Sequence, residues 1–101
     1  MNDSSNIRIK RLTKRYDQAL RKMLATGDLG AELKFITIKR LSLSKDIGHL
    51  KIFYANSRLQ ASEGIDYQQR LDEKIFLIQK VLAKQNLRKI PKIRFIHDPE
   101  D

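Results

Sequence analysis

The fold is decided by residues 35–55, whose sequence is FITIKRLSLSKDIGHLKIFYA. Apolar and polar side chains alternate from Phe35 to Leu43, which is typical of a half-buried strand. The alternation changes phase after Ile38, because the next apolar residue is Leu41, three positions further on. A strand keeps one face across such a point only if it gains an extra residue, so the sequence predicts a β-bulge or strong twist around residues 39–40.

Residues 44–48, SKDIG, have the composition of a turn, since Ser and Asp side chains accept hydrogen bonds from nearby backbone N–H groups. A second strand is predicted over residues 49–55, with Leu50, Ile52 and Tyr54 on one face. Two strands separated by about five residues of turn composition predict an antiparallel hairpin.

A basic amphipathic helix is predicted before the hairpin, over residues 7–25. Its apolar residues recur at the three- and four-residue spacing of one helical face. They are Ile9, Leu12, Tyr16, Ala19, Leu20, Met23 and Leu24. Gly27 favours a helix end near Thr26, because glycine adopts the left-handed conformation freely, and Gly30 continues a short turn. The polar residues 1–6 are expected to form a leader outside the helix.

After the hairpin, a polar loop is predicted over residues 56–64, and helical periodicity returns over residues 65–85. That length suits one helix or two helices joined by a kink, with Asp66 as the N-cap. The predicted core face consists of Leu71, Ile75, Ile78 and Leu82, widened by Phe76, Leu77 and Val81.

Pro91 cannot continue a helix, and residues 92–97 alternate again, which predicts a short final strand. The acidic residues 98–101 are expected to fray. The order α-β-β-α(α)-β predicts an α+β fold in which helices cover one face of a sheet and leave the other partly open. A chain of this length predicts a single domain over residues 1–101.

The composition excludes several classes of function. The chain has 21 Lys and Arg against 12 Asp and Glu, a net charge of +9, no cysteine and two histidines. Disulfides, thiolate metal sites and thiol nucleophiles are therefore excluded, and two distant histidines do not predict a metal centre, so no cofactor is expected. Glycine-rich phosphate loops, a signal peptide and a membrane-spanning run are also lacking, which predicts a cytoplasmic protein.

Ser44, Asp46 and His49 lie close together in the predicted turn and invite comparison with a catalytic triad. Three residues of one short loop rarely reach the geometry of a nucleophile, a base and an orienting carboxylate, and no nucleophile elbow surrounds them. Local capping of the turn is the simpler interpretation. The sequence therefore predicts no enzyme activity and no small-molecule substrate.

Two runs of basic residues give the main indication of function. Residues 8–22 contain a single acid, Asp17, and residues 80–94 contain none. Most charged runs are solvated faces, but cations without counter-charge repel one another and destabilise a compact fold. Such surfaces are typical of proteins that bind the phosphate backbone of nucleic acids. The predicted RNA-binding residues are Arg8, Lys10, Arg11, Lys14, Arg15, Lys45, Lys80, Lys84, Arg88, Lys89, Lys92 and Arg94.

The aromatic residues fit the predicted core. Phe35, Phe53, Phe76 and Phe95 all lie in core phases, and core packing is also expected of Tyr54 and Tyr67. No base-stacking platform is therefore expected, and binding should depend on shape and phosphate contacts. A membrane-surface helix is the alternative for residues 7–25, but its apolar stripe holds no Trp or Phe.

Three stretches carry a resemblance to a known family. Residues 35–54 resemble the family's hairpin, with its phase-switching strand and Ser-x-Asp turn. Residues 87–98, LRKIPKIRFIHD, resemble its closing segment, where two basic residues and an apolar residue precede Pro and a short strand. With the basic first helix, these stretches are similar to the ribosome-binding factor A family, bacterial assembly factors of the small ribosomal subunit.

The resemblance implies a type II KH-like fold with a three-stranded mixed sheet, in which the last strand lies beside the first. It also implies a non-enzymatic, monomeric RNA-binding factor of ribosome biogenesis. Such a factor binds the immature 30S subunit through 16S rRNA, assists late rRNA processing, leaves before translation starts and acts in cold adaptation. A general KH-type binder of single-stranded RNA and a protein-interaction module are the alternatives.

The sequence departs from the family at one position. An Ala-x-Gly kink usually joins the two central helices of the family, whereas Glu73, Lys74 and Ile75 occupy the matching positions here. Glycine is the residue that adopts a sharply kinked backbone with the least strain. Because it is absent here, a gentler bend or one continuous helix is expected.

Overall fold

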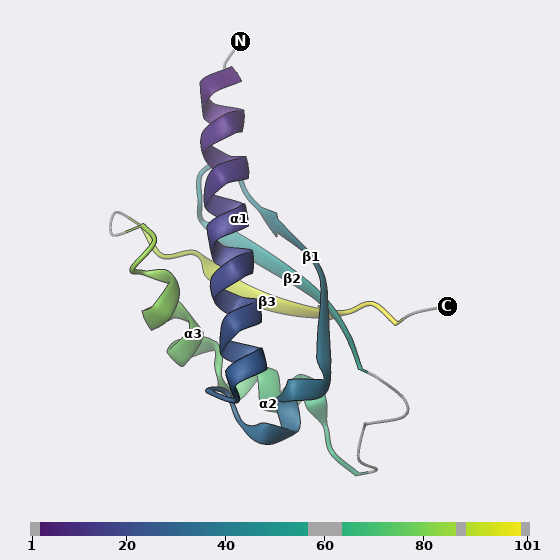
Figure 1. Cartoon of the computed structure of the whole chain (residues 1–101). Helices are drawn as coiled ribbons and strands as arrows, with labels where there is room; N and C mark the ends of the chain where they lie inside the picture. Colours follow the sequence, from purple (N-terminus) through teal and green to yellow (C-terminus); the bar gives the residue numbers. More distant parts are fainter. Residues whose placement is uncertain (1–2, 57–63, 87–88, 100–101) are drawn as a thin grey trace.

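The computed structural model describes residues 3–56, 64–86 and 89–99 (Figure 1). The elements, in chain order, are α1 (Asp3–Thr26), the 3-10 helix η1 (Ala31–Phe35), β1 (Ile36–Leu43), β2 (His49–Asn56), α2 (Tyr67–Glu73), α3 (Ile75–Leu82) and β3 (Lys92–His97). The strands form one mixed sheet, and a single apolar core joins the sheet to the helices. The predicted α+β, KH-like fold is confirmed. Most of the predicted loop at 56–64 lies outside the described residues.

The sheet has the order β1-β2-β3, so β3 lies beside β2. The resemblance implied that the last strand lies beside the first strand, and this expectation was wrong. β1 and β2 are antiparallel, whereas β2 and β3 are parallel. A parallel pair needs a crossover, and α2 and α3 return the chain to the start of β2. There the Lys92 N–H donates to the Gly48 carbonyl at 2.9 Å. The β1 edge instead faces α1, where the Arg21 guanidinium donates to the Ile38 carbonyl at 2.9 Å.

The predicted β-bulge is present in β1. Ile38 is opposite Tyr54 and Arg40 is opposite Phe53, which leaves Lys39 as the extra residue. The bulge lets Ile38 and the later Leu41 face the same core, although three positions separate them in the sequence.

Helix α1 is longer than predicted. It begins at Asp3, so the expectation of a non-helical leader through residue 6 was wrong for residues 3–6. Neither glycine nor proline interrupts these residues, and they extend the helix beyond the end of the sheet (Figure 1). The helix ends as predicted: Gly27 has φ +81°, and the Asp28 N–H donates to the Met23 carbonyl at 3.1 Å.

The short turn predicted after α1 contains the helix η1, which the periodicity did not reveal. Leu29 and Leu33 are fully buried and attach this segment to the core. As a result β1 begins at Ile36, one residue later than predicted.

Residues 65–85 form two helices that separate at Lys74. Lys74 has φ −95° and ψ −2°, and its N–H donates to the Leu71 carbonyl at 3.0 Å. This backbone conformation is open to residues other than glycine, so the break forms without the family's glycine. Asp66 is the N-cap, as predicted, and accepts a hydrogen bond from the Gln69 N–H at 3.1 Å. Helix α3 ends at Leu82, three residues earlier than predicted.

Three of the four phenylalanines do not occupy the predicted core positions. Phe95 is buried, but Phe76 is 68% exposed, Phe35 is 39% exposed and Phe53 lies on the outward face of β2. Leu77 is also exposed, because α3 buries only one narrow side, including Ile78. Tyr54 and Tyr67 are buried as predicted.

Candidate nucleic-acid interface

Helix α1 presents its basic residues to solvent because its apolar stripe is fixed against the sheet. Leu12, Tyr16 and Leu20 are buried at the helical spacing of one face. At about 100° per residue, the basic residues of the same helix fall on the remaining arc. The predicted residues on this arc are all exposed: Arg8, Lys10, Arg11, Lys14 and Arg15.

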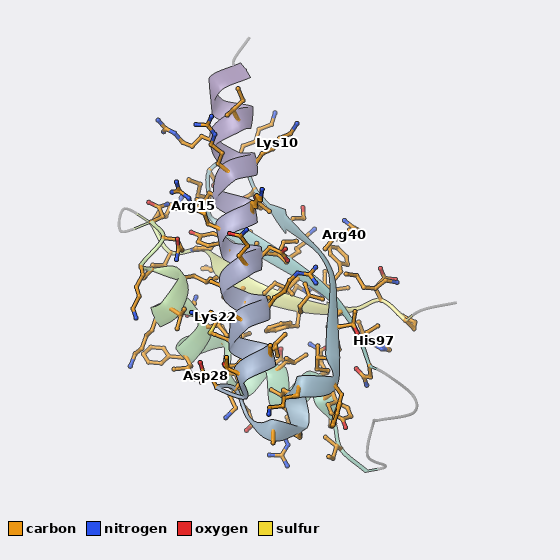
Figure 2. The ribbon with its side chains drawn as sticks, viewed as in Figure 1. Lys10, Arg15, Lys22, Asp28, Arg40 and His97 are labelled. Carbon is orange, nitrogen blue, oxygen red and sulfur yellow. The ribbon has the colours of Figure 1, made fainter. Side chains whose placement is uncertain are left out.

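The basic arc of α1 has two flanks (Figure 2). Lys10 points toward the side of β1, and Arg15 points to the opposite side, where α3 lies. Arg8 and Arg11 share the Arg15 flank, since three- and four-residue steps keep side chains on one helical face.

The α3 flank borders a hollow of about 730 Å³. Arg8, Arg11 and Arg15 line it from α1, and Lys89 lines it from the segment before β3. Among the described residues, none that lines the hollow is acidic. The hollow therefore concentrates positive charge, which suits a phosphate group or a run of phosphates.

The β1 flank borders a shallower groove of about 490 Å³. Lys10 and Lys14 line it from α1, while Lys39 and Arg40 line it from the bulge of β1. The β-bulge therefore contributes two basic residues of β1 to the groove, in addition to those of α1.

Arg21 also lines this groove, but its charge is used within the fold. Its guanidinium bonds to the Asp17 carboxylate at 2.9 Å and to the Ile38 carbonyl at 2.9 Å. The single acid of the α1 run, Asp17, also lines the groove, and its carboxylate is paired there with Arg21.

The structure divides the predicted C-terminal basic set among three places. Lys89 lines the hollow beside α1, whereas Lys80 is exposed on α3 and Lys84 is exposed just after it. Lys92 and Arg94 are on the outward face of β3, away from the helices. Arg88 lies outside the described residues. Alternation along the strand sends Lys92 and Arg94 away from the core that Ile93 and Phe95 enter.

Lys45, at the tip of the hairpin, is exposed near the segment that enters β3. The neighbouring Asp46 carboxylate lies 4.0 Å from the Lys89 ammonium, a loose and exposed ion pair. Such a pair is weak in water, so Lys89 stays available to another anion.

The Ser44–Gly48 turn has capping geometry, as predicted, and its contacts do not form a triad. The Ser44 hydroxyl donates to the Asp46 carboxylate at 2.7 Å and accepts from the Gly48 N–H at 3.1 Å and the His49 N–H at 3.0 Å. It is the backbone of His49 that contacts Ser44. The Ser44 hydroxyl, helped by the Gly48 N–H, lowers the pKa of Asp46.

Sequence patterns missed a second basic surface on the outward face of the sheet. The Arg40 guanidinium carbon lies 3.8 Å from the centroid of the Phe53 ring, over its face. Lys51, in β2, is exposed on the same face. Strand alternation is the signal that places Lys51 and Phe53 on the face opposite to the buried Ile52. In the described part of the chain, no group of three or more His, Asp or Glu residues is placed to hold a metal ion.

Comparison with known proteins gives a consistent set of matches. The family model described as Ribosome-binding factor A matches residues 8–101. Proteins named Ribosome-binding factor A from Francisella tularensis subsp. holarctica (strain LVS), subsp. mediasiatica (strain FSC147) and subsp. novicida (strain U112) are each 29% identical to the chain over 91 residues. The alignment covers 90% of the chain, which spans 63% of the length of each of these relatives.

Proposed function

The chain belongs to the ribosome-binding factor A family, and we propose on this basis that it acts as a non-enzymatic ribosome assembly factor. In this proposal it binds the immature 30S subunit through 16S rRNA in the cytoplasm and assists late maturation of the rRNA. Residues 1–101 act as one KH-like domain and bind as a monomer. A role in growth at low temperature belongs to the same proposal.

The observation that supports this proposal is the uncompensated positive charge of α1. Arg8, Arg11 and Arg15 line the hollow on one flank, and Lys10 and Lys14 line the groove on the other. The only acid between residues 8 and 22 is held by Arg21 at 2.9 Å. Phosphates of folded RNA match such a surface, because binding releases condensed counterions and relieves the repulsion among the cations.

The proposal is tested by reversing two charges on α1. Arg11→Glu/Lys14→Glu alters one residue of the hollow and one of the groove, and neither side chain packs in the core. Purified protein is sedimented through a sucrose gradient with immature small subunits. The fraction of the variant that sediments with subunits is expected to fall at least about tenfold, because phosphate contacts are lost.

Lys34→Glu/Arg70→Glu is the matched control, since it makes the same change in net charge at exposed positions of η1 and α2. The control is expected to sediment with subunits nearly as the unmodified protein does. Far-UV circular dichroism checks that each variant is folded. Equal binding by Arg11→Glu/Lys14→Glu and the control would remove α1 from the interface and contradict the proposal.

An exposed apolar pair supports one second candidate function, a protein-interaction module. Phe76 is 68% exposed and Leu77 is 42% exposed, next to each other on α3. Complete digestion of RNA in cell extract separates the two functions. A complex that survives digestion and is lost in Phe76→Ser would favour the protein-interaction module, whereas a complex released by nuclease favours RNA binding.

A further inference from the structure

The outward face of the sheet carries basic residues beyond those that line the hollow and the groove beside α1, although Arg40, at the bulge, belongs to both the groove and this face. The buried residues of the strands, such as Ile52 in β2 and Ile93 in β3, face the side on which the helices pack. Figure 1 shows α1 crossing over the sheet, with α2 and α3 on the crossover that joins β2 to β3. Residues of the alternate phase therefore form the opposite face.

The strand register arranges this outward face in rows. His49 is opposite Lys92, and the next row consists of Ser42, Lys51 and Arg94. The row beyond it consists of Arg40, Phe53 and Ile96. Neighbouring strands lie about 4.8 Å apart, so each row places its side chains next to one another.

The charge of this face is unfavourable to the fold. Lys51 and Arg94 are direct partners in the register of β2 and β3. Like charges in register on neighbouring strands, about 4.8 Å apart, repel each other. No Asp or Glu occurs in any of the three strands, and Asp98, which follows β3, pairs with Lys39 at 3.8 Å. An anionic ligand is the complement that relieves this repulsion.

The Arg40–Phe53 pair adds a stacking element to the cationic rows. The guanidinium carbon of Arg40 is 3.8 Å from the Phe53 ring centroid, which holds the planar group against the ring face. Arg40 is exposed, so its guanidinium has access to solvent. Nucleic-acid bases stack on guanidinium planes as well as on aromatic rings.

We propose that this outward face, comprising Arg40, Lys51, Phe53, Lys92 and Arg94, is a second RNA-binding surface that takes a single-stranded segment. A single strand exposes unstacked bases that can stack on the Arg40–Phe53 pair while its phosphates contact the neighbouring lysines and arginines. The inference rests on the proposed RNA-binding function and extends it, because the domain then contacts one RNA element beside α1 and a second on the outward face of the sheet.

The test compares two RNA probes by fluorescence anisotropy. One probe is a labelled oligouridylate of about 12 nucleotides, within the usual site size of single-strand binders, and the other is an RNA hairpin. Lys51→Glu/Arg94→Glu is expected to weaken oligouridylate binding by about tenfold or more and hairpin binding by less than about twofold. Arg11→Glu/Lys14→Glu should show the reverse preference, and Lys34→Glu/Arg70→Glu is the control for charge.

Oligouridylate affinity of Lys51→Glu/Arg94→Glu equal to that of the control would overturn the second surface. Should the charge-reversed protein not fold, Lys51→Gln/Arg94→Gln decides the question, with an expected loss of about threefold to tenfold. The second surface would also be overturned, in favour of a membrane-binding surface, by one further result. In that result Lys51→Glu/Arg94→Glu binds phosphatidylglycerol vesicles more weakly than the control does but binds oligouridylate equally well. The subunit sedimentation of Arg11→Glu/Lys14→Glu is a separate result, so the second surface and the assembly function fail independently.

Discussion

The side chain of Asp46 helps to hold the turn of the hairpin in shape. Its carboxylate accepts hydrogen bonds from the Ser44 hydroxyl at 2.7 Å and from the Gly48 N–H at 2.9 Å. Both bonds are strongest while the carboxylate is ionised, and they hold the pKa of Asp46 below its ordinary value of 3.8. The charge that stabilises the turn also brings Asp46 within 4.0 Å of Lys89 at the edge of the hollow.

We predict that Asp46 makes the stability of the protein depend on pH in the acid range. Because folding lowers its pKa, its contribution is fully present above the pKa of the unfolded chain and is lost as pH falls through the lower folded pKa. Urea unfolding between pH 7 and about pH 2.5 should show a difference between the unmodified protein and Asp46→Asn that shrinks below pH 3.8. A difference that stays constant across this range would contradict the prediction.

Gly27 permits a conformation at the end of α1 that other residues adopt only with strain. With φ at +81°, an added Cβ would also lie 2.9 Å from the Lys34 Cε, although that flexible side chain can move. Gly27→Ala should therefore lower the free energy of unfolding by about 1 kcal/mol, and Gly27→Asn should lower it less because asparagine tolerates the left-handed region. Chemical denaturation measures both, and equal losses would point to crowding by Lys34 instead.

At the level of elements, the break at Lys74 determines which side chains of α3 reach the core. The periodicity over residues 65–85 predicted a wide apolar face that included Phe76 and Leu77. The short α3 instead buries a narrow stripe, with Ile78 fully buried and Leu77 42% exposed. Neighbouring residues on a helix point about 100° apart, which is enough to separate core from solvent.

The adjacent pair in α3 gives a matched test of this orientation. Ile78→Ala should lower the free energy of unfolding by about 2–5 kcal/mol, because it leaves a cavity in the core. Leu77→Ala should lower it by less than about 1 kcal/mol, because the side chain is largely in water already. Thermal and urea unfolding measure both variants, and similar losses would mean that α3 is rotated about its axis.

At the level of the whole molecule, basic residues far apart in sequence are gathered into separate surfaces. Lys89 joins the α3 flank of α1 across the hollow, while Lys92 and Arg94 join Lys51 on the outward face of the sheet. A formal charge of +9 is therefore not spread evenly. Separate cationic surfaces allow one small domain to hold two segments of the same RNA.

Salt dependence should report the phosphate contacts of α1. Each lysine or arginine that contacts a phosphate contributes about one to the slope of log affinity against log salt concentration. Arg11→Ala/Lys14→Ala should therefore reduce the slope for the RNA hairpin by about two, and Lys34→Ala/Arg70→Ala should leave it unchanged. Anisotropy titrations over a series of salt concentrations measure the slopes. Identical slopes for the two double variants would exclude Arg11 and Lys14 as phosphate contacts.

The local elements could be predicted because periodicity and turn chemistry act over a few residues. The phase change after Ile38 predicted the bulge, the Ser44–Gly48 composition predicted the turn, and the apolar stripe of α1 predicted which of its residues are exposed. The basic arc of α1 followed from the same stripe, since a helix that buries one side must expose the other.

Long-range packing decided the rest. The edge that β3 joins depends on the path of α2 and α3, and the outward face depends on which side of the sheet the helices cover. Neither property is encoded in spacing along the chain, so the C-terminal basic residues looked like one group although the fold divides them. The physical reason is that alternation tells which side chains share a face, whereas only burial against distant elements determines whether that face meets the core or water.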